Sequence, residues 1–545
     1  MIPDLLVGAL CLVSLGLSIL ESRLNVDAHH WGLMYSNATD LNLGMLPYKE
    51  FFIQYGFLTT WIHSLALRLF GNAIASVGIM TGIFYAANLF LSYVLWQKIL
   101  NKWLSVLSVL LMFLLHTHIT YPWSNYLAYS FLLLSLVCLV HVPPKKSWYF
   151  LAGLFWSCSV LCRQTFIVFI APFGIYFLWK LLVFPGSRRA IFGKQIAFFA
   201  VGSALVFASF FLFLLKIDAL QNWYLQSVRV VNLYNYGVGA GLSGKAVFVF
   251  KNIINSAVSL SDARLTMYSL IFIACVIILL MVASGTANLA RFGRLGAWSA
   301  SIETESALLI YSLTVIVGFF QAMPTYELWR LQSSSSLGVG VVVFCLNQFR
   351  LRHLNNVSLK SLRLSRFNMF IVLLSMSIVI TMALAYLQPW AKFSRVAAGG
   401  QPKRGGLAKL MSGSLKSPPE IPIFRGKLYS GEVINYYEEI KSAMDQYSSK
   451  LAYVVNFTMD STVPYLTDKV KRPHRSPFYI RSFGNSVFPD EPKVIDRLID
   501  DGKVIIVAPS KEDIPASYCI VLQKDSPRLT FVAVPRAVAS NCKVS

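Results

Sequence analysis

The chain has 545 residues, of which 56% are hydrophobic and only 13% charged, and its mean hydropathy is +0.59. A soluble globular protein carries about 25% charged residues and about 45–50% apolar residues. This composition excludes an intrinsically disordered chain, a fibrous repeat and a disulfide-stapled secreted module. It predicts a polytopic membrane protein.

Apolar segments near the length of a membrane-spanning helix, roughly 20 residues, recur along the first 387 residues. About eleven transmembrane helices are predicted, at 3–20, 74–95, 103–117, 125–141, 148–162, 164–184, 195–215, 267–284, 306–323, 335–348 and 367–387. The first segment lacks a basic start and a small-residue cleavage site, so we expect it to be a retained helix rather than a signal peptide.

The loops between these segments alternate in charge. One set is basic: Lys98 and Lys102; Lys145 and Lys146; Arg188, Arg189 and Lys194; Arg291 and Arg294; Arg350, Arg352, Lys360, Arg363 and Arg366. Cytoplasmic loops carry such an excess of Lys and Arg. The pattern therefore predicts a cytoplasmic N-terminus and an extracytoplasmic C-terminal region, with long outer loops at 21–73 and 216–266. Because much of the net charge of +23 sits in short loops, it does not indicate binding to nucleic acid.

The last 158 residues have a different composition, with fifteen of the 25 acidic residues and 23 of the 48 basic ones. Gly- and Ser-rich residues 388–425 are expected to be a linker between a membrane domain (1–387) and a water-facing domain (426–545). Within the latter the pattern predicts helices at 432–447 and 492–500 and strands at 451–457, 503–507, 518–522 and 529–534, which is typical of a small α/β domain.

Two further features of the C-terminal region give expectations. Six of the eight cysteines lie in apolar segments, whereas Cys519 and Cys542 share the water-facing part and could pair. The basic run at 469–475 is expected to be solvated or to lie near anionic lipid or polysaccharide.

The first outer loop collects four of the ten carboxylates of the membrane part: Glu21, Asp27, Asp40 and Glu50. Such a loop is often only a solvated connection with amphipathic interface helices. A carboxylate held at the membrane surface is also suited to take a proton from an acceptor hydroxyl, as general-base catalysis requires.

The same loop resembles that of the GT-C membrane glycosyltransferases, a superfamily that includes protein O-mannosyltransferases and the aminoarabinose transferases of lipid A. The residues that carry the resemblance are Asp27-Ala-His29-His30-Trp-Gly32 and Pro47-Tyr48-Lys-Glu50-Phe-Phe52-Ile-Gln54-Tyr55-Gly56. The resemblance implies a GT-C-like membrane domain. It also implies an inverting transfer of a sugar from a polyprenyl-phosphate donor to a hydroxyl of an envelope glycan or lipid on the outer face.

The resemblance also assigns a catalytic role to Asp27, which matches the family's acidic residue just after the first span. Many relatives have a second acid in the next outer loop, but residues 116–125 contain no carboxylate here. Glu50 or His30 is therefore expected to assist Asp27.

The donor's leaving group is an anionic lipid phosphate, so the site should offer cations at membrane depth. Arg163 and Arg330 are placed to bind this phosphate, since Arg makes bidentate contacts with phosphate. Arg163 belongs to the basic-Gln pair that family members tend to have. The alternative is that each side chain extends to the lipid headgroups. The other predicted substrate-binding residues are Gln164, Tyr55, His29 and Tyr48.

No cofactor is expected; a divalent metal at His29 and His30 stays open but is not favoured, because adjacent histidines lack the i, i+4 spacing of a helical metal site. The predicted location is a bacterial inner membrane. Two other functions remain open: an O-antigen polymerase- or ligase-like envelope enzyme, and a secondary transporter, although no internal repeat supports the latter.

Overall fold

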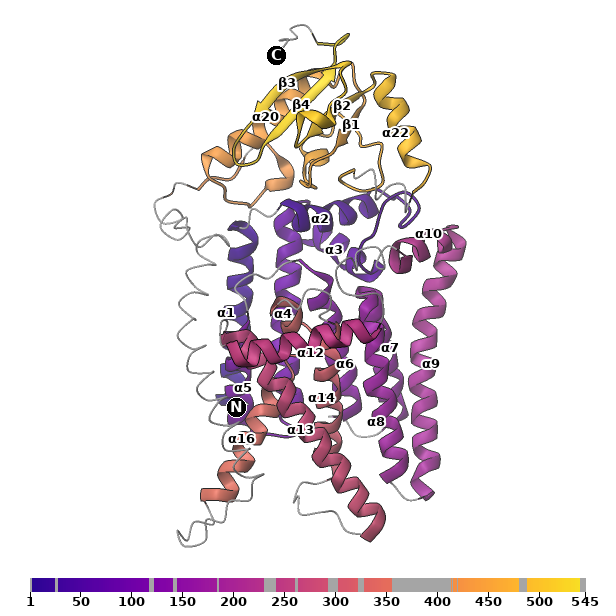
Figure 1. Ribbon diagram of the computed structural model, residues 1–545, viewed down its shortest axis with the longest axis vertical. Coiled ribbons are helices and arrows are strands. Elements are labelled where there is room, and N and C mark those ends of the chain that lie inside the picture. Colours follow the sequence, from indigo (N-terminus) through magenta and orange to yellow (C-terminus); the bar gives the residue numbers. More distant parts are fainter. Residues whose placement is uncertain are drawn as a thin grey trace.

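The computed structural model describes residues 2–24, 28–116, 122–140, 145–183, 186–229, 242–259, 263–292, 302–321, 328–354, 413, 415–418, 420–479 and 488–539. Figure 1 shows a bundle of helices with a smaller sheet-containing domain over one end. This is the predicted division into a membrane part and a C-terminal α/β domain.

The long helices of the bundle follow the predicted spans. They are α1 (Ile2–Leu24), α4 (Ile74–Trp96), α5 (Lys102–Leu115), α6 (Ser124–Val140), α7 (Lys146–Cys162), α8 (Ile170–Val183, preceded by the 3-10 turn η1, Gln164–Phe169), α9 (Gly186–Lys216), α13 (Ala263–Phe292), α14 (Ile302–Gln321) and α16 (Gly338–Leu354). Six of the described helical segments are long and apolar enough to cross a bilayer. Every predicted span that falls on described residues coincides with a helix, and the span predicted at 367–387 lies outside them.

The outer loops contain further short helices. The first loop forms α2 (Ala28–Asn42) and α3 (Phe57–Phe70), and the second forms α10 (Leu220–Tyr224), the π-helical turn η2 (Leu225–Arg229) and α12 (Leu242–Ser259). Because α1 continues to Leu24, the carboxylate of Glu21 lies in a helix and is 1% exposed. The expectation that Glu21 belongs to a loop was therefore wrong.

The C-terminal domain has the predicted helices, α20 (Gly431–Tyr447) and α22 (Glu491–Asp500), with a four-stranded sheet of order β1-β2-β4-β3. Strands β1 (Tyr453–Asn456) and β2 (Val504–Ala508) are parallel, whereas β4 (Thr530–Pro535) is antiparallel to both β2 and β3 (Tyr518–Lys524). Cys519 is disulfide-bonded, and its partner lies outside the described residues.

The folded C-terminal domain begins before residue 426. Phe424, in the 3-10 turn η3 (Pro422–Phe424), and Ile421, just before it, are fully buried in its core. Lys416 forms an antiparallel β-bridge with Tyr429. Of these, Lys416, Ile421 and Phe424 were predicted to belong to the linker. This stretch is otherwise rich in Pro and Ser, but it contains apolar side chains. Their burial offsets the cost of ordering the segment, which explains why it folds with the domain.

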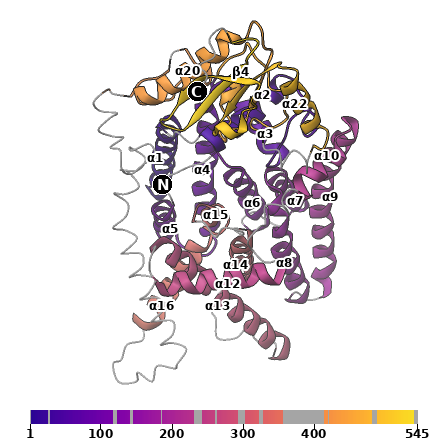
Figure 2. The same cartoon turned by 45° about the horizontal axis from the view of Figure 1, so that its top comes forward.

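The C-terminal domain and the outer end of the bundle share one hydrophobic core. Trp31 and Tyr35 of α2 pack in the same cluster as Tyr437 and Val532 of the domain. Figure 2 shows the domain lying over α2 and α3. Helix α2 is thus held between the helical bundle and the C-terminal domain.

A buried ion pair crosses this interface. Arg472 pairs with Asp40 of α2, and the two side chains are only 8% and 4% exposed. The Tyr465 hydroxyl donates to Asp40 Oδ1 at 3.0 Å, and Arg472 Nη1 donates to Ser36 Oγ at 2.8 Å. Burial raises the pKa of the Asp40 carboxyl, and the Arg472 charge opposes that rise. At Arg472, therefore, the basic run is not solvated as predicted.

Candidate functional site

Two of the sequence motifs meet where the first outer loop touches the end of α7. Gly56 N donates to Cys162 O at 3.0 Å, and Thr59 Oγ1 donates to the same carbonyl at 2.9 Å. A Cβ atom on Gly56 would lie 1.9 Å from Leu161 O, so only glycine permits this approach. The contact brings Tyr55, one residue earlier, to Arg163, one residue later.

Trp123 lies at the centre of an aromatic and cationic cluster that includes four predicted site residues. Its ring centroid is 5.0 Å from that of His30 and 6.4 Å from that of Tyr55. The guanidinium carbon of Arg330 lies 5.7 Å from the Trp123 ring, and that of Arg163 lies 5.1 Å from the Tyr55 ring. Residues from four separate segments thus converge, and we call this group the Trp123 cluster.

Arg163 is a buried cation, 7% exposed, at the extended residue between α7 and η1. Its Nη1 donates to Ser124 Oγ at 3.1 Å, and no carboxylate among the described residues pairs with it. Its charge and that of Arg330 are close enough to repel each other. Burying a cation without a counter-ion costs several kcal/mol, and a second cation nearby adds to that cost. A bound anion would offset both terms.

Arg330 is carried by the short helix α15 (Leu328–Gln332), which a buried polar network fixes in place. Gln332 Nε2 donates to Leu115 O at 3.3 Å, and Ser336 Oγ lies 3.0 Å from His116 Nε2 and 2.9 Å from the Tyr268 hydroxyl. His116 is 2% exposed and belongs to this network, which reaches the helix of Arg330 through the hydrogen bond from Ser336 Oγ to Gln332 O.

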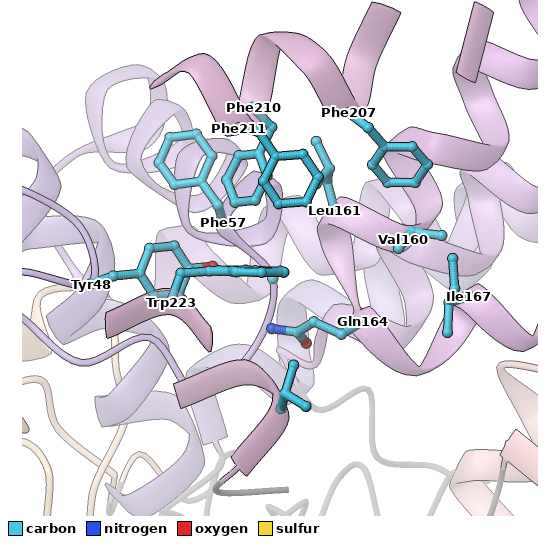
Figure 3. Close-up of a pocket in the computed structure, with 12 residues that line it drawn as sticks. Tyr48, Phe57, Val160, Leu161, Gln164, Ile167, Phe207, Phe210, Phe211 and Trp223 are labelled. Atoms are coloured by element: carbon cyan, nitrogen blue, oxygen red, sulfur yellow. The ribbon is translucent and has the colours of Figure 1, made fainter. Parts of the chain in front are cut away.

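An apolar cavity of about 370 Å³ lies beside the Arg163 segment. Figure 3 shows Phe57, Phe207, Phe210 and Trp223 around it, with the amide of Gln164 to one side of these rings. Its polar lining residues are Gln164 and Tyr48, and several apolar ones, such as Ile167, remain exposed. The cavity therefore suits an apolar chain with access from the lipid.

Tyr48 lines the cavity because its loop is held at two points by the side chain of Gln226. Gln226 Nε2 donates to Tyr48 O at 2.7 Å, and Gln226 Oε1 accepts from Ile53 N at 3.1 Å. Tyr48 itself adopts a φ of 65°, a strained value for a non-glycine residue, which the surrounding contacts must compensate. The predicted substrate-binding residues Tyr48 and Gln164 therefore both line the cavity.

Asp27 lies outside the described residues, and two other predicted residues, Glu50 and His29, are not part of this cluster. Glu50 is exposed, and its Oε2 accepts from Leu46 N at 2.6 Å, so the described contact of its carboxylate closes its own turn. His29 Nδ1 lies 3.1 Å from Met459 O and its ring packs beside Phe478, which places it at the interface with the C-terminal domain.

A metal centre finds no support in the part of the chain that the structure describes, where no three His, Cys, Asp or Glu side chains gather as metal ligands would. The absence of a cofactor stays a prediction.

Sequence reasoning did not identify Trp123 or Trp329, whose ring centroids lie 3.5 Å apart. The available signal was their spacing, because each tryptophan lies in a short polar stretch between apolar spans, one of them next to Arg330. It also did not identify Gln226, since nothing in the second outer loop marks one amide as the loop's anchor.

The fold and the spans define a multi-pass membrane protein, and comparison with known proteins shows which fold it has. Residues 55–215 match the family described as dolichyl-phosphate-mannose-protein mannosyltransferase. The structure resembles that of ArnT from Cupriavidus metallidurans bound to undecaprenyl phosphate, with a TM-score of 0.52 and 12% identity over 98% of this chain and 99% of that one.

The apo state of ArnT gives the same TM-score of 0.52, with 13% identity over 98% of each chain. The apo oligosaccharyltransferase of Archaeoglobus fulgidus is less similar, with a TM-score of 0.46 and 12% identity over 92% of this chain and 69% of that one. No curated protein matches the sequence. The chain has the GT-C fold of membrane glycosyltransferases, as the first outer loop predicted.

Proposed function

We propose that this protein is a membrane glycosyltransferase that moves a sugar from a polyprenyl-phosphate donor to a hydroxyl of an envelope glycan or lipid on the outer face of the membrane. The observation that carries the proposal is that Arg163 and Arg330 both lie in the Trp123 cluster, while Gln164, next to Arg163 in the chain, lines an apolar cavity. A lipid phosphate has the matching chemistry, an anionic head on an apolar chain.

In this proposal the donor phosphate binds between Arg163 and Arg330, and the first part of the polyprenyl chain occupies the cavity next to Gln164. Arg suits this role because its planar guanidinium donates two parallel hydrogen bonds to phosphate. The aromatic faces of Tyr55 and Trp123 hold both guanidinium groups from the side opposite to the phosphate. The ArnT structure that this fold resembles contains undecaprenyl phosphate, a ligand of the same class.

The transfer step needs one base. The acceptor oxygen forms a bond to the anomeric carbon of the sugar while the bond from that carbon to the phosphate oxygen breaks. Polyprenyl phosphate leaves with the bonding electrons, and the acceptor proton passes to the carboxylate that resemblance assigns, Asp27. Of the two predicted assistants, His30 lies in the Trp123 cluster, so it is better placed than Glu50 to share the proton.

The orientation that we propose has the C-terminal domain outside a bacterial inner membrane. In Figure 1 the N-terminal end of α1 lies on the far side of the bundle from that domain, as an odd number of crossings requires. The disulfide at Cys519 agrees with this side, because disulfides persist in oxidising compartments.

The test is a transfer assay with protein reconstituted in liposomes and polyprenyl-phosphate sugars extracted from the source organism. The product to measure is free polyprenyl phosphate, whatever sugar is moved. Wild type should release it, Asp27→Asn should release at least about 100-fold less, and Glu50→Gln should stay within a few-fold of wild type. If the sugar crosses the membrane still attached to its carrier, the protein is a transporter and the proposal fails.

An O-antigen polymerase or ligase would give a different product. Such an enzyme transfers a preassembled glycan from a lipid carrier, so mass spectrometry of the acceptor would show the gain of several sugars instead of one. That result would contradict the single-sugar donor that we propose.

A further inference from the structure

A second cavity, of about 360 Å³, lies on another side of the bundle from the apolar cavity. It is formed by the outer ends of α1 and α3, the start of α4, and residues 425–426 of the C-terminal domain. The apolar cavity is instead formed in part by α7 and α9. Figure 1 and Figure 2 show α1 and α9 at opposite sides of the bundle.

The charge of this second cavity is positive. Arg23 and Arg425 both line it and are exposed, and none of its described lining residues is acidic. Arg23 Nε donates to Gly426 O at 3.0 Å, which holds this guanidinium beside the residue that follows Arg425. Two cations thus line one hollow at the junction of the two domains, and Arg23 is held there by its hydrogen bond.

The surface next to this cavity is apolar and exposed. Ile19 and Ile79 line the cavity itself, and Phe70 at its rim is 43% exposed. Further along the same two long helices, Leu12 of α1 is 71% exposed and Ile83 of α4 is 39% exposed. A ligand with an anionic head and apolar chains would satisfy both surfaces at once.

We propose that this cavity binds the phosphate headgroup of an anionic phospholipid of the outer leaflet. The phosphate would lie between Arg23 and Arg425, and the acyl chains would follow the exposed faces of α1 and α4. This site is separate from the arginine pair proposed for the sugar donor, and it does not depend on the transferase activity.

The bound lipid would also fasten the C-terminal domain to the bundle at the point where the two meet. Leu428 N donates to Arg23 O at 2.8 Å, so the backbone around Arg23 already supports the first residues of the domain. A headgroup bridging Arg23 and Arg425 would add a second link at the same place. Anionic lipid should therefore stabilise the full-length protein more than zwitterionic lipid does.

The test is lipid retention by the delipidated full-length protein, measured by native mass spectrometry after titration with phosphatidylglycerol or phosphatidylcholine. Wild type should prefer phosphatidylglycerol. Each basic side chain near a membrane surface contributes about fivefold to such a preference. The double variant Arg23→Gln/Arg425→Gln should therefore lose about 25-fold of it.

A matched control removes two positive charges elsewhere. Lys450 and Lys503 are exposed on the C-terminal domain, outside the cavity, so Lys450→Gln/Lys503→Gln should keep the preference. If Arg23→Gln disturbs folding, Arg425→Gln alone carries the test, because the Arg425 side chain is exposed.

Three results would overturn the proposal. They are a wild type with no preference for phosphatidylglycerol, a double variant that keeps the preference, and inorganic phosphate that displaces the lipid at equal concentration. The last result would mean that the cavity binds free anions rather than a lipid headgroup. The outcome is independent of transfer activity, so this proposal and the proposed function can fail separately.

Discussion

The ion pair between Asp40 and Arg472 offers the sharpest test of how the C-terminal domain is held on the bundle. Both side chains are less than a tenth exposed, and Tyr465 and Ser36 satisfy further polar atoms of the pair. Asp40→Asn would leave the Arg472 charge buried without a counter-ion. Breaking one partner of a buried pair costs about 3–5 kcal/mol, so we expect a loss of unfolding free energy in that range.

Removing both charges should cost less than removing one. The double variant Asp40→Asn/Arg472→Gln leaves no uncompensated charge, so it should recover at least about 2 kcal/mol relative to Asp40→Asn. The exposed pair between Lys503 and Asp501 is the control, and Asp501→Asn should change stability by less than about 1 kcal/mol.

The assay is a urea titration of the full-length protein in detergent, read by proteolysis of the C-terminal domain. Urea unfolds the water-facing part while the apolar bundle stays in its micelle, so the midpoint reports the interface and the domain. The reasoning would be refuted if the unfolding free energy of Asp40→Asn lay within about 1 kcal/mol of the wild-type value. A double variant no more stable than Asp40→Asn would refute it as well.

Three further predictions concern single residues. Gly56→Ala should lower stability by about 1–3 kcal/mol in a thermal melt, because its Cβ would overlap the carbonyl of Leu161, whereas Gly174→Ala, with open space around it, should not be destabilising. Trp123→Ala should reduce sugar transfer by more than tenfold, whereas Trp123→Phe should keep most of it, because an aromatic ring still supports Arg330. Equal transfer activities of the two variants would contradict a role of the Trp123 ring in the site. Burial lowers the pKa of His474 to about 3, whereas its value in the unfolded chain is about 6.5. Between these two pH values the unfolded state therefore binds one more proton than the folded state. The stability of the protein should fall as the pH drops from about 6.5 toward 3. The unfolding equilibrium constant of wild type should rise up to tenfold per pH unit relative to that of His474→Asn in this window, and parallel pH profiles would contradict the assignment.

The spans and the strands could be predicted from the sequence because each depends on a local pattern. A helix in lipid must bury its own backbone hydrogen bonds, so the length and apolarity of α4 or α9 are visible without tertiary information. The strands of the C-terminal domain are similarly visible as short β-branched runs between polar turns. The antiparallel arrangement of β3 and β4 was not, because strand direction depends on how the chain returns to the sheet.

The contacts that build the domain interface and the candidate site were harder to predict because they join distant segments. Asp40 and Arg472 are 432 positions apart, and neither residue type favours burial until the partner is known. Arg163 and Arg330 were both selected as phosphate ligands from their apolar surroundings, but the ring of Trp123 that lies between their segments had no such signal. Glu21 was assigned to a loop because a carboxylate at the end of an apolar run normally marks its end.

The central claim is that Arg163 and Arg330 bind the phosphate of a polyprenyl donor. The most direct measurement compares the affinity of purified protein for undecaprenyl phosphate with its affinity for undecaprenol, which has the same chain without the charge. Wild type should bind the phosphate at least about tenfold more tightly, and Arg163→Gln/Arg330→Gln should bind both lipids equally while keeping its affinity for undecaprenol. Equal binding of the two lipids by wild type would contradict the account.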